Sequence, residues 1–298
     1  MQPKINTFLL GAQKAGTTSL YDWLGQHPAI EAPLAIKDYH FFCNDTYYKK
    51  GHDHLETFYK NNEALINLHG AVNYLYFHQV SAARIHAYNP EAKLIICLRN
   101  PVDRAISAYK YFTRVLQENN SFHDALEKEI NGELTTFKEL SNNSYISHGF
   151  YDEQINSFLN YFNPAQLLVL GFDELTDPNK QRETLIKVFQ FLNVDSTPVI
   201  NFNHLNLSGT PKIKWLNRFI RESQTKKIIT RLFPYAIRKK IGKTIRQKNI
   251  SKTTLHVEIN QNDRERLIQL YAPHQKELER ILHANNLSSI NLTTNKHG

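Results

Sequence analysis

Cysteine is scarce in this sequence, and long hydrophobic runs are absent from it. Two cysteines in 298 residues do not suggest the dense disulfide framework of small secreted domains. No stretch approaches the roughly 20 consecutive apolar residues of a membrane-spanning helix, and the first residues lack the pattern of a signal peptide. We therefore expect a cytoplasmic protein, with peripheral contact at the inner face of the membrane left open.

Low-complexity tracts, internal repeats and Pro- or Ser-rich linkers are missing as well. With 41% hydrophobic residues, the chain can bury a large core. We expect a single domain over residues 1–298. It would consist of an α/β core over residues 1–210 and a basic helical C-terminal extension over residues 211–298.

A loop that binds an anion is predicted over residues 11–19. Residues 7–10 form a short apolar run typical of a buried strand, and a helical face follows the loop. That face consists of Leu20, Trp23, Leu24 and His27. A strand-to-helix junction presents free backbone N–H groups and the positive end of the helix dipole, here joined by the Lys14 ammonium. The pattern favours a phosphorylated or sulfated ligand, the alternative being that Thr and Ser only cap the helix.

The position of the lysine argues against a nucleoside triphosphatase loop. In that loop, the lysine directly follows the second glycine and precedes a magnesium-binding hydroxyl. Here Lys14 precedes Gly16, and Thr17 stands where that lysine would be. A nucleotide kinase or phosphotransferase is therefore kept only as an alternative function.

A second strand-to-helix junction follows the apolar residues 94–98, which suit a strand buried on both faces. Asn100 can cap the helix that begins there. Arg99 at the end of the strand and Ser107, about two helical turns later, can share an anion. In the alternative interpretation, Arg99 pairs with a carboxylate such as Asp103, and Ser107 bonds to a backbone carbonyl.

Residues 212–248 contain thirteen Lys or Arg residues and one acidic residue, so they account for the whole net charge of +8. Apolar residues alternate with the basic ones, which indicates amphipathic helices. Such a segment is typical of contact with an anionic membrane surface or a polyanion. A non-catalytic protein that binds such partners is the second alternative function; no nucleic acid is expected.

Three motifs resemble those of sulfotransferases that use 3′-phosphoadenosine 5′-phosphosulfate (PAPS). They are Q-K-A-G-T-T-S-L at residues 13–20, K-D-Y-H-F-F at residues 37–42 and L-R-N-P-V-D-R-A-I-S-A-Y at residues 98–109. The bacterial and heparan-type carbohydrate sulfotransferases are the most similar branch. The resemblance implies a P-loop-like three-layer α/β sandwich with a mainly parallel sheet. It also implies metal-independent, in-line transfer of a sulfuryl group to a hydroxyl or amine of a saccharide or glycolipid, leaving 3′-phosphoadenosine 5′-phosphate.

The same resemblance implies roles for individual residues. The cofactor-binding positions are Lys14, Ala15, Gly16, Thr17, Thr18, Ser19, Arg99, Ser107, Tyr151, Ser208, Gly209 and Lys212. The catalytic positions are Lys14, Lys37, Asp38 and His40. The glutamate that often acts as the general base in this family is replaced by Asp38, so the base stays open between Asp38 and His40. Phe41 and Phe42 are expected in the core.

Overall fold

A five-stranded sheet forms the centre of the computed structural model, which describes residues 4–61, 63–202, 210–211, 250–251, 258–288, 290 and 292. The strands are β1 (Thr7–Gly11), β2 (Ile30–Glu31), β3 (Ile66–Gly70), β4 (Lys93–Leu98) and β5 (Leu167–Gly171). Their order is β2-β3-β1-β4-β5, and all neighbours are parallel. The predicted α/β class and parallel sheet are confirmed.

The order of the strands decides where a ligand can bind. From β1 the chain leads to β2 on one side, whereas from β4 it leads to β5 on the other. The connections therefore diverge between the neighbouring strands β1 and β4, and such switch points open a crevice at the carboxyl ends of the strands. The chain stays close to β4 beyond β1, because the Ala12 N–H donates to the Cys97 carbonyl at 2.6 Å.

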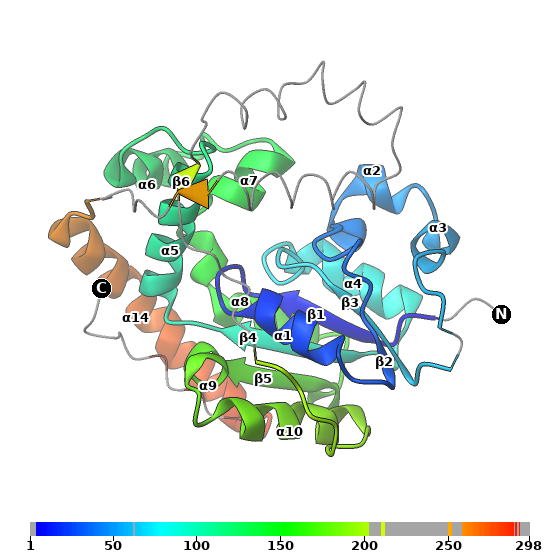
Figure 1. Cartoon of the computed structure of the whole chain (residues 1–298). Coiled ribbons are helices and arrows are strands. Elements are labelled where there is room, and N and C mark those ends of the chain that lie inside the picture. The colour runs from blue at the N-terminus through cyan, green and yellow to red at the C-terminus, as the bar shows by residue number, and fades with distance from the viewer. Residues whose placement is uncertain are drawn as a thin grey trace.

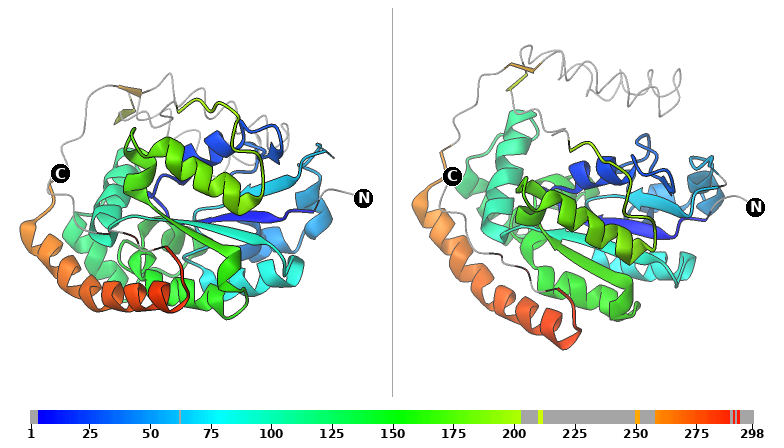
Figure 2. Two further views of the ribbon diagram at one scale, coloured as in Figure 1. Left: turned by 90° about the horizontal axis from the view of Figure 1, so that it is seen from below. Right: turned by 60° about the horizontal axis from the view of Figure 1, so that its bottom comes forward.

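Helices cover both faces of the sheet. They are α1 (Thr17–Leu24), α2 (Asp45–Tyr48), α3 (His52–Glu56), α4 (His78–Tyr88), α5 (Pro101–Arg114), α6 (Phe122–Ile130), α7 (Phe137–Asn143), α8 (Tyr151–Leu159), α9 (Phe172–Thr176), α10 (Gln181–Leu192) and α14 (Gln261–Ala284). In Figures 1 and 2, α1 and α10 lie on one face of the sheet, and α4 and α8 lie on the other. A short antiparallel pair joins β6 (Thr210–Pro211) to β7 (Ile250–Ser251).

The buried residues confirm two predictions made from the apolar pattern. Residues 94–98 are fully buried, as a strand between two helical layers requires. Phe41 and Phe42 are fully buried too, so the prediction that they belong to the core is correct. Cys43 and Cys97 are both buried and unpaired.

The helix boundaries agree with the sequence at one junction and differ at the other. The Asn100 side chain accepts hydrogen bonds from the N–H groups of Val102 and Asp103, so it is the predicted N-cap of α5. By contrast, α1 ends at Leu24, and His27 lies beyond it. The His27 imidazole is nevertheless buried and lies 2.8 Å from the Asp195 carbonyl, which explains why its position fits an apolar pattern.

The C-terminal helix α14 packs against α5 and α8 (Figure 1). The Tyr271 hydroxyl donates to the carbonyls of Ile146 at 2.7 Å and Tyr145 at 3.2 Å. A Cβ atom on Gly149 would lie 2.7 Å from the Tyr271 ring, so glycine is required there. The four Lys and Arg residues of α14 equal its four Asp and Glu residues. The excess positive charge therefore belongs to residues 212–248, which lie outside the described residues.

Within the described ranges, no helix combines the length and apolar character needed to cross a membrane.

Replacing Tyr271 by Phe should destabilise the protein by about 1–2 kcal/mol, because two buried carbonyls lose their shared donor. Denaturant unfolding measures this change. Ile268→Ala is the matched control, since Ile268 lies on the same helix and is 44% exposed; it should change stability by no more than about 0.5 kcal/mol. Equal effects of the two variants would contradict the assigned role of Tyr271.

Candidate functional site

The loop between β1 and α1 presents unpartnered backbone donors. Lys14 and Gly16 adopt left-handed conformations, with φ of 68° and 81°. Gly16 is the N-cap of α1 and provides no side-chain cap. No described residue accepts a hydrogen bond from the N–H groups of Gly16, Thr17 or Thr18. Such a concave set of donors at a helix N-terminus suits an anion, and the interpretation in which Thr or Ser side chains cap the helix is wrong.

The side chains of this loop differ in exposure. Thr17 and Ser19 are buried, whereas Thr18 is exposed. Ala15 is fully buried, and its N–H donates to the Ala12 carbonyl at 3.2 Å, so this group is already occupied. The predicted binding loop therefore offers the backbone of Gly16, Thr17 and Thr18 rather than that of Ala15.

Three cations gather beside this loop; we refer to Lys14, Arg99 and Arg114 as the cation cluster. The Lys14 Nζ atom lies 4.4 Å from the centre of the Tyr111 ring, and the Arg114 guanidinium lies 5.4 Å from the same centre. Arg99 donates to the Lys14 carbonyl at 3.4 Å. Burial, reinforced by the charges of Arg114 and then Arg99, lowers the pKa of Lys14 to about 8.

Arg99 forms no salt bridge with any residue that the structure describes. Its guanidinium lies 4.4 Å from the centre of the Phe172 ring at the start of α9. Asp103 pairs instead with Arg264 of α14 at 3.1 Å, so the alternative in which Asp103 forms a salt bridge with Arg99 is wrong. Burial lowers the pKa of Arg99, although the charge of Asp103 opposes this shift.

Tyr151 lies near Arg99 at the start of α8, and Ser107 lies on α5, the helix that follows Arg99. Tyr151 begins α8 and is 2% exposed; burial raises the pKa of its hydroxyl to about 12, while the nearby charges of Arg104 and Arg99 oppose the rise. This burial suits a group that supports Arg99 from the interior. Ser107 is half-buried on α5, at the helical spacing that places it on one face with Tyr111 and Arg114.

Three residues near this site escaped the sequence analysis: Tyr111, Arg114 and Phe172. Tyr111 and Arg114 follow Ser107 at the i+4 and i+7 positions of the same helix, so their spacing was a usable signal. Phe172 carried no such signal, because only the sheet places the end of β5 beside the end of β4. All three cations of the cluster thus lie against an aromatic ring.

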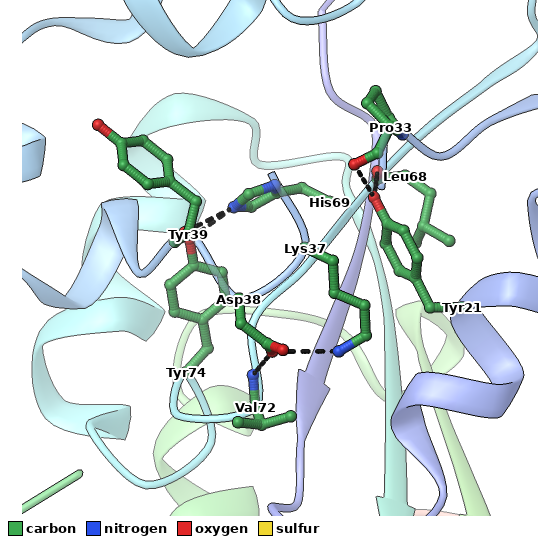
Figure 3. Close-up of polar contacts among 9 residues, drawn as sticks. All are labelled: Tyr21, Pro33, Lys37, Asp38, Tyr39, Leu68, His69, Val72 and Tyr74. Carbon is green, nitrogen blue, oxygen red and sulfur yellow. Dashed lines mark hydrogen bonds and ion pairs between the residues drawn. The ribbon is translucent and has the colours of Figure 1, made fainter. Parts of the chain in front are cut away.

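Lys37 and Asp38 form an ion pair near the same edge of the sheet (Figure 3). The Lys37 Nζ atom lies 3.1 Å from Asp38 Oδ1, and the Val72 N–H donates to this oxygen at 3.3 Å. Asp38 has a φ of 62°, and its own N–H donates to the Gly70 carbonyl at the end of β3. A Cβ atom on Gly11 would lie 2.7 Å from the Val72 carbonyl, so these contacts bring Asp38 to the end of β1.

The two candidate bases differ in their surroundings. The Asp38 side chain is 43% exposed. Its partner Lys37 is only 5% exposed, and the Lys37 ammonium lies 5.6 Å from the centre of the Tyr21 ring of α1. A buried ammonium thus holds an accessible carboxylate. The half-buried His40 ring packs 5.9 Å from the Phe137 ring at the start of α7. Of the two candidate bases, Asp38 is therefore the more exposed.

Three predicted cofactor-binding residues, Ser208, Gly209 and Lys212, lie outside the described residues. Among the residues that are described, no three His, Cys, Asp or Glu side chains gather in an arrangement that could hold a metal ion.

Residues 4–271 match the protein family described as the sulfotransferase domain. Bifunctional heparan sulfate N-deacetylase/N-sulfotransferase 1 of Mus musculus is 30% identical over 238 residues, which cover 75% of this chain and 25% of that protein. Carbohydrate sulfotransferase 15 of Mus musculus is 25% identical over 245 residues, covering 63% of this chain and 43% of that protein. The chain spans about a quarter of the length of the heparan sulfate relatives that it matches.

The fold is also similar to that of a solved structure. The crystal structure of a sulfotransferase from Alicyclobacillus acidocaldarius aligns with a TM-score of 0.69 and 24% sequence identity. The alignment covers 94% of this chain and 96% of that chain. The two proteins therefore share an architecture over nearly their whole length.

The low pKa of Lys14 predicts pH-dependent binding of phosphate-containing ligands. Lys14 loses its proton as the pH rises through about 8, so the affinity for adenosine 3′,5′-bisphosphate should fall above that pH, approaching about tenfold per pH unit for one linked proton. Calorimetric titration from about pH 7 to about pH 9 measures this dependence. Lys14→Arg keeps its charge over this range and should flatten the curve. Parallel curves for the two proteins would contradict the assignment.

Proposed function

Because the chain belongs to the sulfotransferase family, we propose that it transfers a sulfuryl group from PAPS to a saccharide. The observation that carries the proposal is the pairing of two anion-binding features at the β1–β4 switch point. One feature is the set of unpartnered N–H groups in the loop before α1, and the other is the cation cluster beside it. A nucleotide with phosphate groups at two positions fits this arrangement.

The residues on β1 and α1 would hold the 5′ end of the nucleotide. The N–H groups of Gly16, Thr17 and Thr18 would bind the 5′-phosphate, with the hydroxyls of residues 17–19 as additional donors. Lys14 would stabilise the negative charge that develops on this phosphate as the sulfuryl group departs. When bound, PAPS supplies the activated sulfuryl group.

The residues on β4 and α5 would hold the other end. Arg99 has no carboxylate partner among the described residues and is therefore available to a 3′-phosphate. Ser107 would add a hydroxyl from α5, the helix that begins two residues after Arg99. A kinase would need magnesium and a triphosphate, and the absence of a lysine directly after Gly16 speaks against that alternative.

Asp38 is the base in this proposal. It would accept the proton of the acceptor hydroxyl or amine while the acceptor atom forms its bond to sulfur and the phosphate oxygen leaves. Lys37 would hold the carboxylate in place and stabilise the charge around the sulfuryl group. A saccharide acceptor is supported by the relatives, whose names specify heparan sulfate and carbohydrate. We also propose a cytoplasmic location, with contact between residues 212–248 and an anionic surface.

Calorimetry with adenosine 3′,5′-bisphosphate, ADP and ATP with magnesium tests the donor. The bisphosphate should bind without metal and more tightly than either other nucleotide. Arg99→Ala should weaken it roughly 10- to 100-fold, since a hydrogen bond to a charged group contributes about 1.5–3 kcal/mol. The exposed Arg182 of α10 provides the control, Arg182→Ala, which should bind normally. Preference for ATP with magnesium would favour a kinase instead.

Steady-state kinetics with PAPS and a saccharide acceptor test the base. Asp38→Asn keeps the size of the side chain but loses the basic group, so kcat should fall by roughly 10²- to 10⁴-fold with unchanged nucleotide affinity. His40→Gln should retain most of the activity. The reverse pattern would assign the base to His40.

A further inference from the structure

A polar pocket lies between residues 117–120, which follow α5, and the helices α6 and α7, outside the site described above. Its volume is about 450 Å³, within the range of roughly 300–1,000 Å³ that ligand pockets occupy. The lining side chains include amides and ammonium groups: Gln117, Asn119, Asn120, Asn143, Lys128 and Lys138. Most ligand pockets are lined chiefly by apolar groups, so this composition favours a ligand rich in hydroxyl and carboxylate groups.

A buried carboxylate fixes the shape of one wall. Glu118 is 5% exposed, and its Oε1 atom accepts hydrogen bonds from the N–H groups of Asn119 and Asn120, each at 2.9 Å. Its Oε2 atom accepts from the Asn143 amide at 2.9 Å and the Tyr145 hydroxyl at 3.0 Å. Both oxygens of Glu118 therefore accept hydrogen bonds from the protein itself. The bond to Asn143 joins the segment after α5 to the end of α7.

The second carboxylate of the pocket is bonded at one oxygen. Glu139 Oε2 accepts hydrogen bonds from the N–H and hydroxyl groups of Thr136 at 2.9 and 2.7 Å. The first of these and the bond from the Glu139 N–H to the Thr136 hydroxyl oxygen at 3.2 Å form the capping box of α7. In contrast, Lys128 and Lys138 form no salt bridge with any described residue. The pocket therefore offers two ammonium groups without a salt bridge, beside the buried Glu118 and the half-buried Glu139.

Both walls of the pocket are connected to the loop that carries Lys14. On one side, Tyr111 of α5 contacts the Lys14 ammonium, and Gln117 follows six residues later. On the other side, the Gln13 amide donates to the Ser141 carbonyl of α7 at 2.9 Å, two residues before Asn143. In Figure 1, α6 and α7 lie beside α5, at the end of the sheet where the strands terminate.

We propose that this pocket binds acidic sugar units of the acceptor chain, away from the unit that receives the sulfuryl group. The inference rests on the proposed function, which supplies a saccharide as the acceptor. Amide side chains donate to and accept from sugar hydroxyls, and the two ammonium groups pair with uronate carboxylates. The pocket would therefore select a long acidic chain over a short fragment of the same chain.

Two unsulfated probes built from glucuronic acid and N-unsubstituted glucosamine test this inference: an octasaccharide and a disaccharide. KM for the octasaccharide should rise roughly tenfold or more, equivalent to about 1.4 kcal/mol, in each of two double variants. These variants are Lys128→Ala/Lys138→Ala and Gln117→Ala/Asn119→Ala. Both kcat and KM for the disaccharide should stay unchanged. The controls are Lys276→Ala and Gln269→Ala, which remove exposed side chains of α14. Normal affinity for adenosine 3′,5′-bisphosphate verifies that each variant is folded.

An unchanged KM for the octasaccharide in both pocket variants would overturn the inference, and so would an equal rise in the controls. If the unmodified protein sulfates neither probe, the proposed acceptor fails, and calorimetric binding of the octasaccharide in the presence of adenosine 3′,5′-bisphosphate decides the pocket. Binding that is lost in the pocket variants alone would still support it. Absent binding, or binding that survives in those variants, would overturn it.

Discussion

The repulsion among three neighbouring cations is the constraint on which this site depends. Burial, reinforced by the neighbouring charges of Arg114 and Arg99, lowers the pKa of Lys14, and no described carboxylate forms a salt bridge with any of the three. A partly buried cluster of like charges is unfavourable unless an anion binds, because desolvation and repulsion act in the same direction. The rings of Tyr111 and Phe172 offset part of this cost without neutralising the charge. The site is therefore preorganised for an anion, which would relieve the repulsion on binding.

The acidic residues around the site are directed elsewhere, and this arrangement preserves its positive charge. Asp103 pairs with Arg264 and helps hold α14 against α5, while Asp38 pairs with Lys37 at the opposite side of the loop. Each pairing has a second function. The first joins the C-terminal helix to the helix that follows Arg99, and the second presents an accessible carboxylate in a fixed position. The cation cluster and the accessible Asp38 carboxylate thus occupy separate positions at one edge of the sheet.

The polar pocket beside α6 and α7 also contains side chains of both charges. Glu118 is buried behind its internal hydrogen bonds, and Glu139 accepts hydrogen bonds from Thr136 at one oxygen, so both carboxylates shape the wall. Lys128 and Lys138 add two ammonium groups to the lining. The use of Glu118 as a structural acceptor parallels that of Asp103, which pairs with Arg264 and leaves Arg99 without a salt bridge among the described residues.

The sequence by itself determined the elements and the chemistry of the two junctions. An apolar run followed by Asn100 predicts a strand and a capped helix, because these are local properties of the backbone. It did not determine which charges neutralise one another: Asp103 is a near neighbour of Arg99 in the chain, yet it pairs with Arg264, 161 residues away. Only the tertiary structure decided this pairing, since the packing of α14 on α5 brings a competing cation to Asp103. It also placed Phe172 beside Arg99 and Val72 beside Asp38, because parallel strands far apart in the chain end at one edge of the sheet.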